Sequence, residues 1–239
     1  MPRTAAPVNL RFDHRTDDGP VLGLGTGAPR LSWQVPAADD DYAQSGYEIE
    51  ITRAGVPQSK HAITSPEQVL VPWPDHPLAS RESAEVRIRV RGTGDEWSDW
   101  SEPAVVEAGL LQPDDWTARF VSPRDIGAVG SPAPILSGSI ELPDNIVQAR
   151  LYATAHGVYV PELNGRRVGD EQLAPGWTSY QFRLRYQTHD VTDLVRPGTN
   201  ELDFLVGNGW HRGPPRLQRP KRRVRRPAGC PRPARGDHR

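Results

Sequence analysis

The sequence predicts an all-β protein made of two consecutive β-sandwich domains. Proline and glycine are abundant, with 25 and 22 of the 239 residues, and both residues break helices. Short runs that alternate apolar and polar residues recur along the chain, a period typical of half-buried strands. Turn-forming residues separate these runs. Together these observations favour many short strands over a helical bundle.

The first domain is expected over residues 8–112. A short strand over residues 28–35 follows a Gly/Pro loop, and residues 47–51 alternate apolar and acidic side chains. Residues 86–91 alternate in the same way, with valine and isoleucine on one face and three arginines on the other. A closing strand is expected over residues 103–107. Roughly seven strands in about 100 residues are typical of an immunoglobulin-like sandwich.

Two tryptophans in the run Trp-Ser-Asp-Trp-Ser (residues 97–101) follow the three alternating arginines across one turn. Guanidinium groups stack on indole faces, with a gain of about 0.5–1 kcal/mol at each exposed pair. The arrangement resembles the tryptophan–arginine ladder of fibronectin type III domains. We therefore expect it to stabilise the first domain rather than to bind a ligand.

The second domain is expected over residues 113–213, with the junction between the domains at residues 110–116. A loose loop is expected over residues 122–134. Asn164-Gly165 is a strong hairpin signal, because both positions tolerate positive φ. The strand candidates are residues 118–121, 149–153, 157–160 and 201–206.

Four motifs follow one another in the second domain: NGRRVGD at 164–170, LAPGWTSY at 173–180, YQTHDVT at 186–192 and GNGW at 207–210. Their order and spacing resemble the N-terminal β-sandwich module of bacterial α-L-rhamnosidases. The first domain, with PRLSW at 29–33, is similar to the fibronectin type III-like domain that precedes this module. The resemblance covers about residues 8–213, and it implies a jelly-roll-like second sandwich that lacks its last strands.

Enzymes of that family hydrolyse terminal α-L-rhamnose from glycosides with inversion, using acidic residues on a downstream helical barrel, where one acts as general acid and another as general base. No part of this sequence resembles the barrel. The resemblance therefore implies an accessory fragment, inactive alone, whose natural packing partner is the catalytic domain. A stand-alone carbohydrate-binding module and a fibronectin-like protein-interaction module are the alternatives.

Binding of a rhamnose-containing glycoside is the open functional question for the second domain. Calcium-dependent modules of the family use an acidic residue directly before the hairpin asparagine, and here that position holds Leu163. The alternative to sugar binding is that the tryptophans belong to the core and that the hairpin is only a turn. The candidates offer aromatic faces to sugar CH groups or polar atoms to hydroxyls: Trp177, Tyr180, Trp210, Asn164 and Asp170.

No other motif in the sequence predicts chemistry. The seven histidines and the single cysteine, Cys230, show no metal-ligand spacing. No nucleophile elbow is present. The glycine-rich run at residues 23–27 leads into a strand instead of the helix that a phosphate loop requires. We therefore expect no catalytic residue, no metal and no cofactor.

The net charge of −1 conceals a basic segment over residues 214–239, which holds ten Lys or Arg and one acidic residue. We predict an Arg/Pro-rich disordered tail, produced by a frameshift or truncation, with a genuine disordered arm as the alternative. The tail has no aromatic side chains for base stacking, so no nucleic-acid partner is expected. No signal peptide or run of ~18–20 apolar residues is visible. We therefore expect no membrane partner and a cytoplasmic location.

Overall fold

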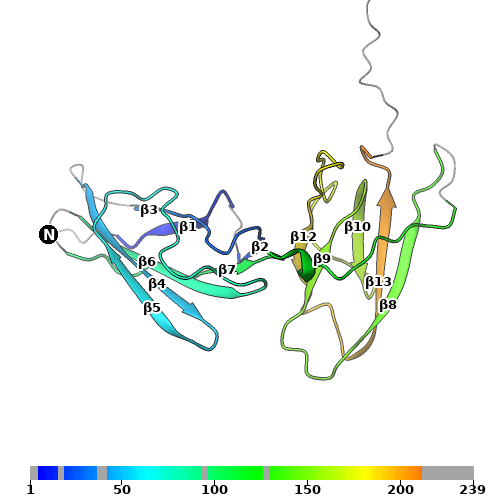
Figure 1. Cartoon of the computed structure of the whole chain (residues 1–239). Coiled ribbons are helices and arrows are strands. Elements are labelled where there is room, and N and C mark those ends of the chain that lie inside the picture. The colour runs from blue at the N-terminus through cyan, green and yellow to red at the C-terminus, as the bar shows by residue number, and fades with distance from the viewer. Residues whose placement is uncertain (1–4, 16–18, 37–41, 93–95, 126–129, 212–239) are drawn as a thin grey trace, which may run out of the picture.

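The computed structural model describes residues 5–15, 19–36, 42–92, 96–125 and 130–211, and these residues form two β-sandwich modules (Figure 1). The predicted fold class is confirmed. The only helix within the described ranges is the short 3-10 helix η1 (Pro113–Asp115), which lies between the modules. No helix of this described part is long and apolar enough to cross a membrane. The predicted tail over residues 214–239 lies outside the described residues.

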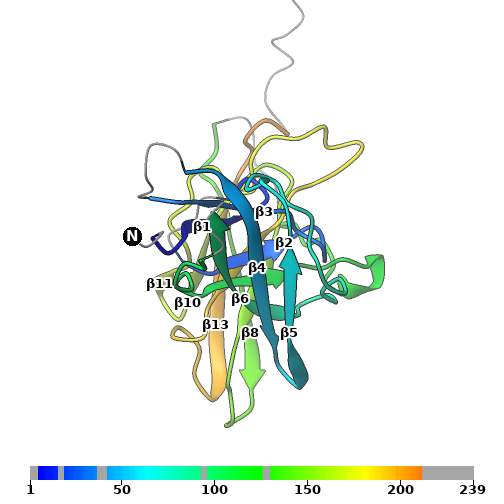
Figure 2. The ribbon, with the colours of Figure 1, turned by 90° about the vertical axis from the view of Figure 1, so that its left-hand side faces the viewer.

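The first module places a five-stranded sheet, in the order β2-β7-β6-β4-β5, against the strand pair β1-β3. In Figure 2 this module faces the viewer. Strand β5 was not predicted, because its polar sequence shows little alternation. The strands are β1 (Val8–Phe12), β2 (Val21–Leu24), β3 (Leu31–Gln34), β4 (Gln44–Arg53), β5 (Val56–Ile63), β6 (Ser83–Gly92) and β7 (Ala104–Ala108).

The core of the first module comes from the period-two pattern of its two long strands. Ile49 of β4 lies opposite Ile88 of β6, and both are fully buried. Trp33 of β3 packs into the same cluster and meets Tyr47 edge-on, with 4.9 Å between the ring centroids. One alternating face of each strand therefore supplies the apolar interior.

The tryptophan–arginine ladder is confirmed on the opposite face of β6. Arg89 lies 4.9 Å from the ring centroids of both Trp97 and Trp100. Arg87 lies 5.0 Å from the Trp100 ring, and Arg91 lies 5.2 Å from the Trp97 ring. The cations and indoles thus alternate along the strand within the range of cation–π attraction.

The serines of the same run attach it to β6. The backbone N–H groups of Val90 and Ile88 donate to the hydroxyls of Ser98 and Ser101, each at 3.0 Å. The serine N–H groups donate in return to the carbonyls of Val90 and Ile88, at 2.8 and 2.7 Å. Residues 97–101 therefore provide hydrogen-bond partners for the backbone N–H and C=O groups of β6 that β7 does not reach.

The second module stacks two sheets of unequal size. The larger sheet has the order β11-β10-β13-β8, and the smaller sheet is the pair β12-β9. The Asn164-Gly165 hairpin is confirmed, since the two residues have φ of 52° and 73° between β10 and β11. The strands are β8 (Ile135–Leu142), β9 (Arg150–Ala153), β10 (Val158–Leu163), β11 (Arg166–Arg167), β12 (Gln187–Asp190) and β13 (Gly198–Gly207).

The strand predicted over residues 118–121 was wrong, because this segment is not a strand and pairs with none of the described strands. Phe120 and Val121 are 61% and 74% exposed, so their apolar alternation meets no opposing sheet. The first strand of the module is instead β8, which the sequence did not predict. Its run ILSGSIEL contains two serines and a glycine, which weakened the strand signal.

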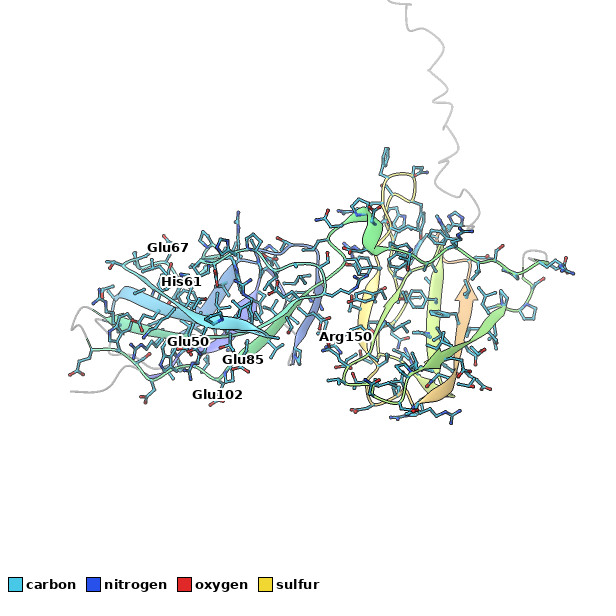
Figure 3. The ribbon with its side chains drawn as sticks, turned by 60° about the horizontal axis from the view of Figure 1, so that its bottom comes forward. Glu50, His61, Glu67, Glu85, Glu102 and Arg150 are labelled. Carbon is cyan, nitrogen blue, oxygen red and sulfur yellow. The ribbon has the colours of Figure 1, made fainter. Side chains whose placement is uncertain are left out.

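The smaller sheet of the second module lies next to the first module (Figure 1). Arg150, at the start of β9, forms an ion pair with Glu107 of β7, with its Nη2 2.9 Å from Oε2. The Glu107 side chain is only 3% exposed and that of Arg150 12%. Figure 3 labels Arg150 on the side of its module that faces the first one. Tyr186 adds a hydrogen bond by accepting from the N–H of Leu110 at 2.8 Å.

Candidate carbohydrate-binding surface

The loop that carries Trp177 and Tyr180 is anchored by Tyr159, a buried residue of β10. The N–H of Tyr159 donates to the carbonyl of Ala174 at 2.8 Å. Its hydroxyl lies 3.0 Å from both the Ala153 carbonyl and Gln187 Oε1. Burial raises the pKa of this hydroxyl, so it stays a neutral donor at ordinary pH. The loop therefore begins from a fixed point in the core.

Beyond that anchor the loop presents aromatic side chains to solvent. Trp177 is 66% exposed and Phe182 is 90% exposed. Tyr180 is half-buried, and its ring lies edge-on to His211 with centroids 5.3 Å apart. The ring centroids of His156 and His211 lie 4.7 Å apart. The loop and the end of β13 thus meet in an aromatic cluster, which we define as Phe120, His156, Tyr180 and His211.

The glycines of the GNGW motif bring the end of β13 close to the start of β10. A Cβ atom on Gly157 would lie 2.3 Å from the carbonyl oxygen of Gly207, and one on Gly209 would lie 3.0 Å from the carbonyl carbon of Gly157. Gly157 and Gly209 have positive φ, 110° and 48°, a conformation that glycine adopts without strain. Trp210 follows Gly209 directly, precedes His211 in the chain and is 51% exposed.

Asn164 lies at the opposite end of β10 and serves the fold. Its amide nitrogen donates to the carbonyl of Leu194 at 2.9 Å and to Asn200 Oδ1 at 2.8 Å. Its Oδ1 accepts from the N–H of Glu201 at 3.0 Å. Both amide protons are therefore used within the protein. Asn200 is fully buried and extends the network into the loop before β13.

The structure thus divides the predicted site residues between separate places. Antiparallel pairing sets Val158 opposite Gly207 and Leu163 opposite Leu202. Five residue steps along β10, about 17 Å in an extended strand, therefore separate the end near Asn164 from the end near Trp210. Asp170 is exposed on the segment that follows the hairpin. The structure brings the aromatic candidates to one end of the module and leaves the polar ones elsewhere.

The position before the hairpin asparagine belongs to the core. Leu163 is 2% exposed and packs with Val168 and Val191. It therefore offers neither an oxygen ligand nor a free surface at the position where the resemblance implied an acidic residue for a calcium-dependent site. No group of three or more His, Cys, Asp or Glu side chains in the described ranges is arranged to hold a metal ion.

Three members of the aromatic cluster, Phe120, His156 and His211, were missed by sequence reasoning. They come from three separate segments, so no spacing along the chain marks them. His189 of β12 was also missed. His189 is 7% exposed, and its Nδ1 lies 3.8 Å from Glu171 Oε2. Burial lowers the pKa of His189, although the nearby Glu171 carboxylate acts in the opposite direction.

Family comparisons agree with the two modules. The α-L-rhamnosidase N-terminal domain matches residues 144–228. The Rha78A-like N-terminal immunoglobulin domain matches residues 7–112. The first module is therefore matched as an immunoglobulin domain, which confirms the immunoglobulin-like sandwich predicted from the sequence, while its fibronectin type III-like character stays a prediction. The match to the α-L-rhamnosidase N-terminal domain extends to residue 228, into the segment for which the sequence predicted a tail.

Individual relatives point to the same family. An α-L-rhamnosidase of Formosa agariphila is 31% identical over 207 residues, which are 80% of this chain and 22% of the relative. One of Streptomyces avermitilis is 42% identical over 137 residues, 54% of this chain and 13% of the relative. The crystal structure of native α-L-rhamnosidase from Aspergillus terreus matches 86% of this chain with a TM-score of 0.80 and 41% identity.

The chain spans less than a quarter of each of these proteins, 24% in the case of the Aspergillus terreus structure. Both modules fall within the matched part, because 86% of this chain is superposed. The chain therefore belongs to the α-L-rhamnosidase family, of which it contains the two N-terminal domains.

Proposed function

We propose that this chain is the N-terminal accessory part of an α-L-rhamnosidase and that it does not hydrolyse rhamnosides by itself. The observation that carries the proposal is the match of both modules to the N-terminal domains of enzymes more than four times as long as the matched segment. The buried Glu107–Arg150 ion pair supports the proposal, because it joins the two modules into one accessory unit. In this role the chain holds the catalytic domain and does no chemistry.

The proposal is tested with a chromogenic α-L-rhamnoside and the purified full chain. We expect release of the chromophore at the rate of the buffer blank, while the Formosa agariphila relative, assayed beside it, hydrolyses the same substrate. Rhamnoside hydrolysis that stays with the chain through two chromatography columns, at constant specific activity, would refute the proposal.

Binding of a rhamnoside by the second module is a second candidate function. The specific observation is the exposure of Trp177 and Trp210, 66% and 51%. Each lies within three residues along the chain of a member of the aromatic cluster, Tyr180 or His211. Exposed aromatic rings of this kind can stack on the apolar face of a sugar. Tyr180 adds a hydroxyl that is buried and has no hydrogen-bond partner among the described residues.

This second candidate is tested by calorimetric titration of the full chain with methyl α-L-rhamnoside. We expect Trp177→Ala and Trp210→Ala to weaken binding at least tenfold. The matched control is Trp100→Ala, which removes a tryptophan from the first module and should leave the affinity unchanged. Equal affinity in all variants, or no heat of binding for the unchanged chain, would eliminate this surface as a sugar site.

A further inference from the structure

Two histidines from distant parts of the chain meet at one end of the second module. His156 lies in the turn before β10, and His211 follows β13. Their ring centroids are 4.7 Å apart, and the ring planes differ by 46°. Both residues are exposed, and neither imidazole forms a hydrogen bond or an ion pair with another described residue. Their nitrogen atoms are therefore available to a ligand from solution.

The backbone holds the two histidines side by side. His156 directly precedes Gly157, at which a Cβ atom would lie 2.3 Å from the carbonyl oxygen of Gly207. The N–H of His211 donates to the carbonyl of Asn208 at 3.2 Å, which fixes the other segment. Because the two segments touch through glycines, their backbones approach more closely than larger residues would permit. The imidazoles are therefore carried by a fixed contact rather than by two independent loops.

A neighbouring ring packs against each imidazole. The ring centroid of Phe120 lies 4.8 Å from that of His156, and the centroid of Tyr180 lies 5.3 Å from that of His211. These rings restrict rotation of the imidazoles, as the groups that surround a metal site orient its ligands. The buried Tyr180 hydroxyl has no hydrogen-bond partner among the described residues, which costs about 1–3 kcal/mol. A hydrated ion beside the histidines is the kind of group that supplies such a partner.

The separation of the two imidazoles is the one that chelation requires. A metal ion binds an imidazole nitrogen at about 2.0–2.1 Å, which places the ring centroid about 3.2 Å from the ion. Two imidazoles bound at an angle of roughly 90–110° then have centroids about 4.5–5.2 Å apart. The 4.7 Å between His156 and His211 falls within this range. The pair is therefore spaced to bind one ion.

The chemistry of the donors determines which ions fit. Imidazole nitrogen suits Zn²⁺, Ni²⁺ and Cu²⁺, whereas Ca²⁺ and Mg²⁺ prefer oxygen ligands. Among the ions that suit imidazole, Cu²⁺ binds most tightly at a given site. Two protein nitrogens leave the other coordination positions to water, whereas a structural zinc site uses four protein ligands. The pair is therefore suited to a hydrated transition-metal ion.

We propose that His156 and His211 form a two-histidine site for a hydrated transition-metal ion, with Cu²⁺ bound more tightly than Ni²⁺ or Zn²⁺. The bound ion links the turn before β10 to the end of β13, next in sequence to Trp210. No spacing in the sequence marks the site, because its two ligands come from distant segments. The competing explanation is aromatic packing of the two rings without a ligand.

The test titrates the untagged full chain with CuCl₂, NiCl₂ and CaCl₂ at pH 7.5 in a calorimeter. All chains carry Cys230→Ser, because a thiol would compete for the metal. His156→Gln and His211→Gln each remove one nitrogen ligand. The matched control is His76→Gln, which removes an exposed histidine of the first module. Since neither imidazole of the pair has a hydrogen bond to lose, circular dichroism should show native spectra for all the metal-free variants.

We expect Cu²⁺ to bind the His76→Gln variant within twofold of the parent chain, and His156→Gln and His211→Gln at least tenfold more weakly. Ni²⁺ should follow the same order at lower affinity, and Ca²⁺ should give no heat of binding. Electron paramagnetic resonance of the copper-loaded parent chain should show two coordinating nitrogens, and one in His156→Gln. Equal affinities in all chains, or no saturable binding, would leave aromatic packing as the role of the pair and overturn the inference.

Discussion

At the scale of single residues, Asn164 shows how a side chain suited to sugar hydroxyls is used to hold the fold. Its amide joins the β10–β11 hairpin to Leu194 and to the buried Asn200. Asparagine also tolerates the positive φ that the turn requires. The residue type is therefore explained by local geometry without any ligand.

Replacing Asn164 by aspartate tests this structural role. The carboxylate keeps the size and the tolerance of positive φ but cannot donate to Leu194 or Asn200. We expect the free energy of unfolding to fall by about 2–3 kcal/mol, measured by urea denaturation. Asn145→Asp, in an exposed loop of the same module, should change it by less than about 0.5 kcal/mol. Equal effects of both substitutions would contradict the role assigned to Asn164.

His189 makes the stability of the second module depend on pH. Burial lowers its pKa in the folded state below that of the unfolded chain, about 6.5. The unfolded state therefore takes up a proton first as the pH falls. Stability should be complete above about pH 6.5 and should decrease below it, by at most about 1.4 kcal/mol at pH 5.5.

The pH effect is measured as the urea midpoint of the unchanged chain and of His189→Gln at pH 7.5 and 5.5. The difference between the two pH values should shrink in His189→Gln. It should persist in His156→Gln, which replaces an exposed histidine of the same module. An unchanged pH difference in His189→Gln would show that another group is responsible.

At the scale of elements, the ladder on β6 stabilises an edge that the other strands leave incomplete. Glu48 accepts from Arg89 Nε at 2.6 Å and lies 2.9 Å from the Lys60 ammonium. The guanidinium groups of Arg87 and Arg89 therefore contact both a carboxylate and an indole. This arrangement fixes long side chains that would otherwise be mobile.

Trp100→Ala removes the indole that Lys60, Arg87 and Arg89 share. We expect a loss of about 2 kcal/mol in the unfolding free energy, because each contact contributes about 0.5–1 kcal/mol. Asp99→Ala, an exposed residue of the same run, is the control. Urea denaturation followed by circular dichroism measures both, and a loss no larger than that of the control would contradict the ladder's role.

Strand β8 is an edge of the larger sheet, and this position predicts the behaviour of the second module on its own. Ile140 of β8 is 42% exposed, and a polypeptide of residues 113–239 would also expose the surface that contacts the first module. Unpaired edges and apolar faces promote association. We expect this polypeptide to aggregate in light scattering, whereas residues 1–112 remain monomeric. A monomeric, cooperatively melting 113–239 polypeptide would contradict this view of the module.

At the scale of the whole molecule, the two modules are joined by more than a linker. Gly23 of β2 lies so close to β12 that a Cβ atom would meet the Thr188 hydroxyl at 2.1 Å. Arg81 lies 5.9 Å from the Tyr152 ring, and Tyr186 accepts a hydrogen bond from the N–H of Leu110. The Glu107–Arg150 ion pair, whose side chains are 3% and 12% exposed, adds to these contacts.

Glu107→Ala should therefore separate the modules energetically. Removal of one partner leaves the largely buried Arg150 guanidinium with Asp190 as its ion-pair partner among the described residues, which costs about 3–5 kcal/mol. We expect a single calorimetric transition in the unchanged chain and two in this variant. Glu85→Ala, at an exposed position of β6, should preserve the single transition. A single transition in Glu107→Ala would show that the ion pair does not couple the modules.

The sequence by itself determined the all-β class, the two modules, the ladder and the asparagine–glycine hairpin. Each of these depends on local alternation or on a turn, and such patterns are written in neighbouring residues. Four ordered motifs also sufficed to identify the family, because their spacing is specific.

Only the tertiary structure decided the pairing of β8, the surroundings of Asn164 and the members of the aromatic cluster. Strand β8 acquires its place from β13, some sixty residues later in the chain. Asn164 donates a hydrogen bond to Asn200, 36 residues later in the chain, and the His156 ring contacts the ring of His211, which is also far from it in sequence. Contacts between distant segments leave no pattern among neighbouring residues. The sequence therefore could not show that the Asn164 side chain is used within the fold while Trp177 and Trp210 are exposed.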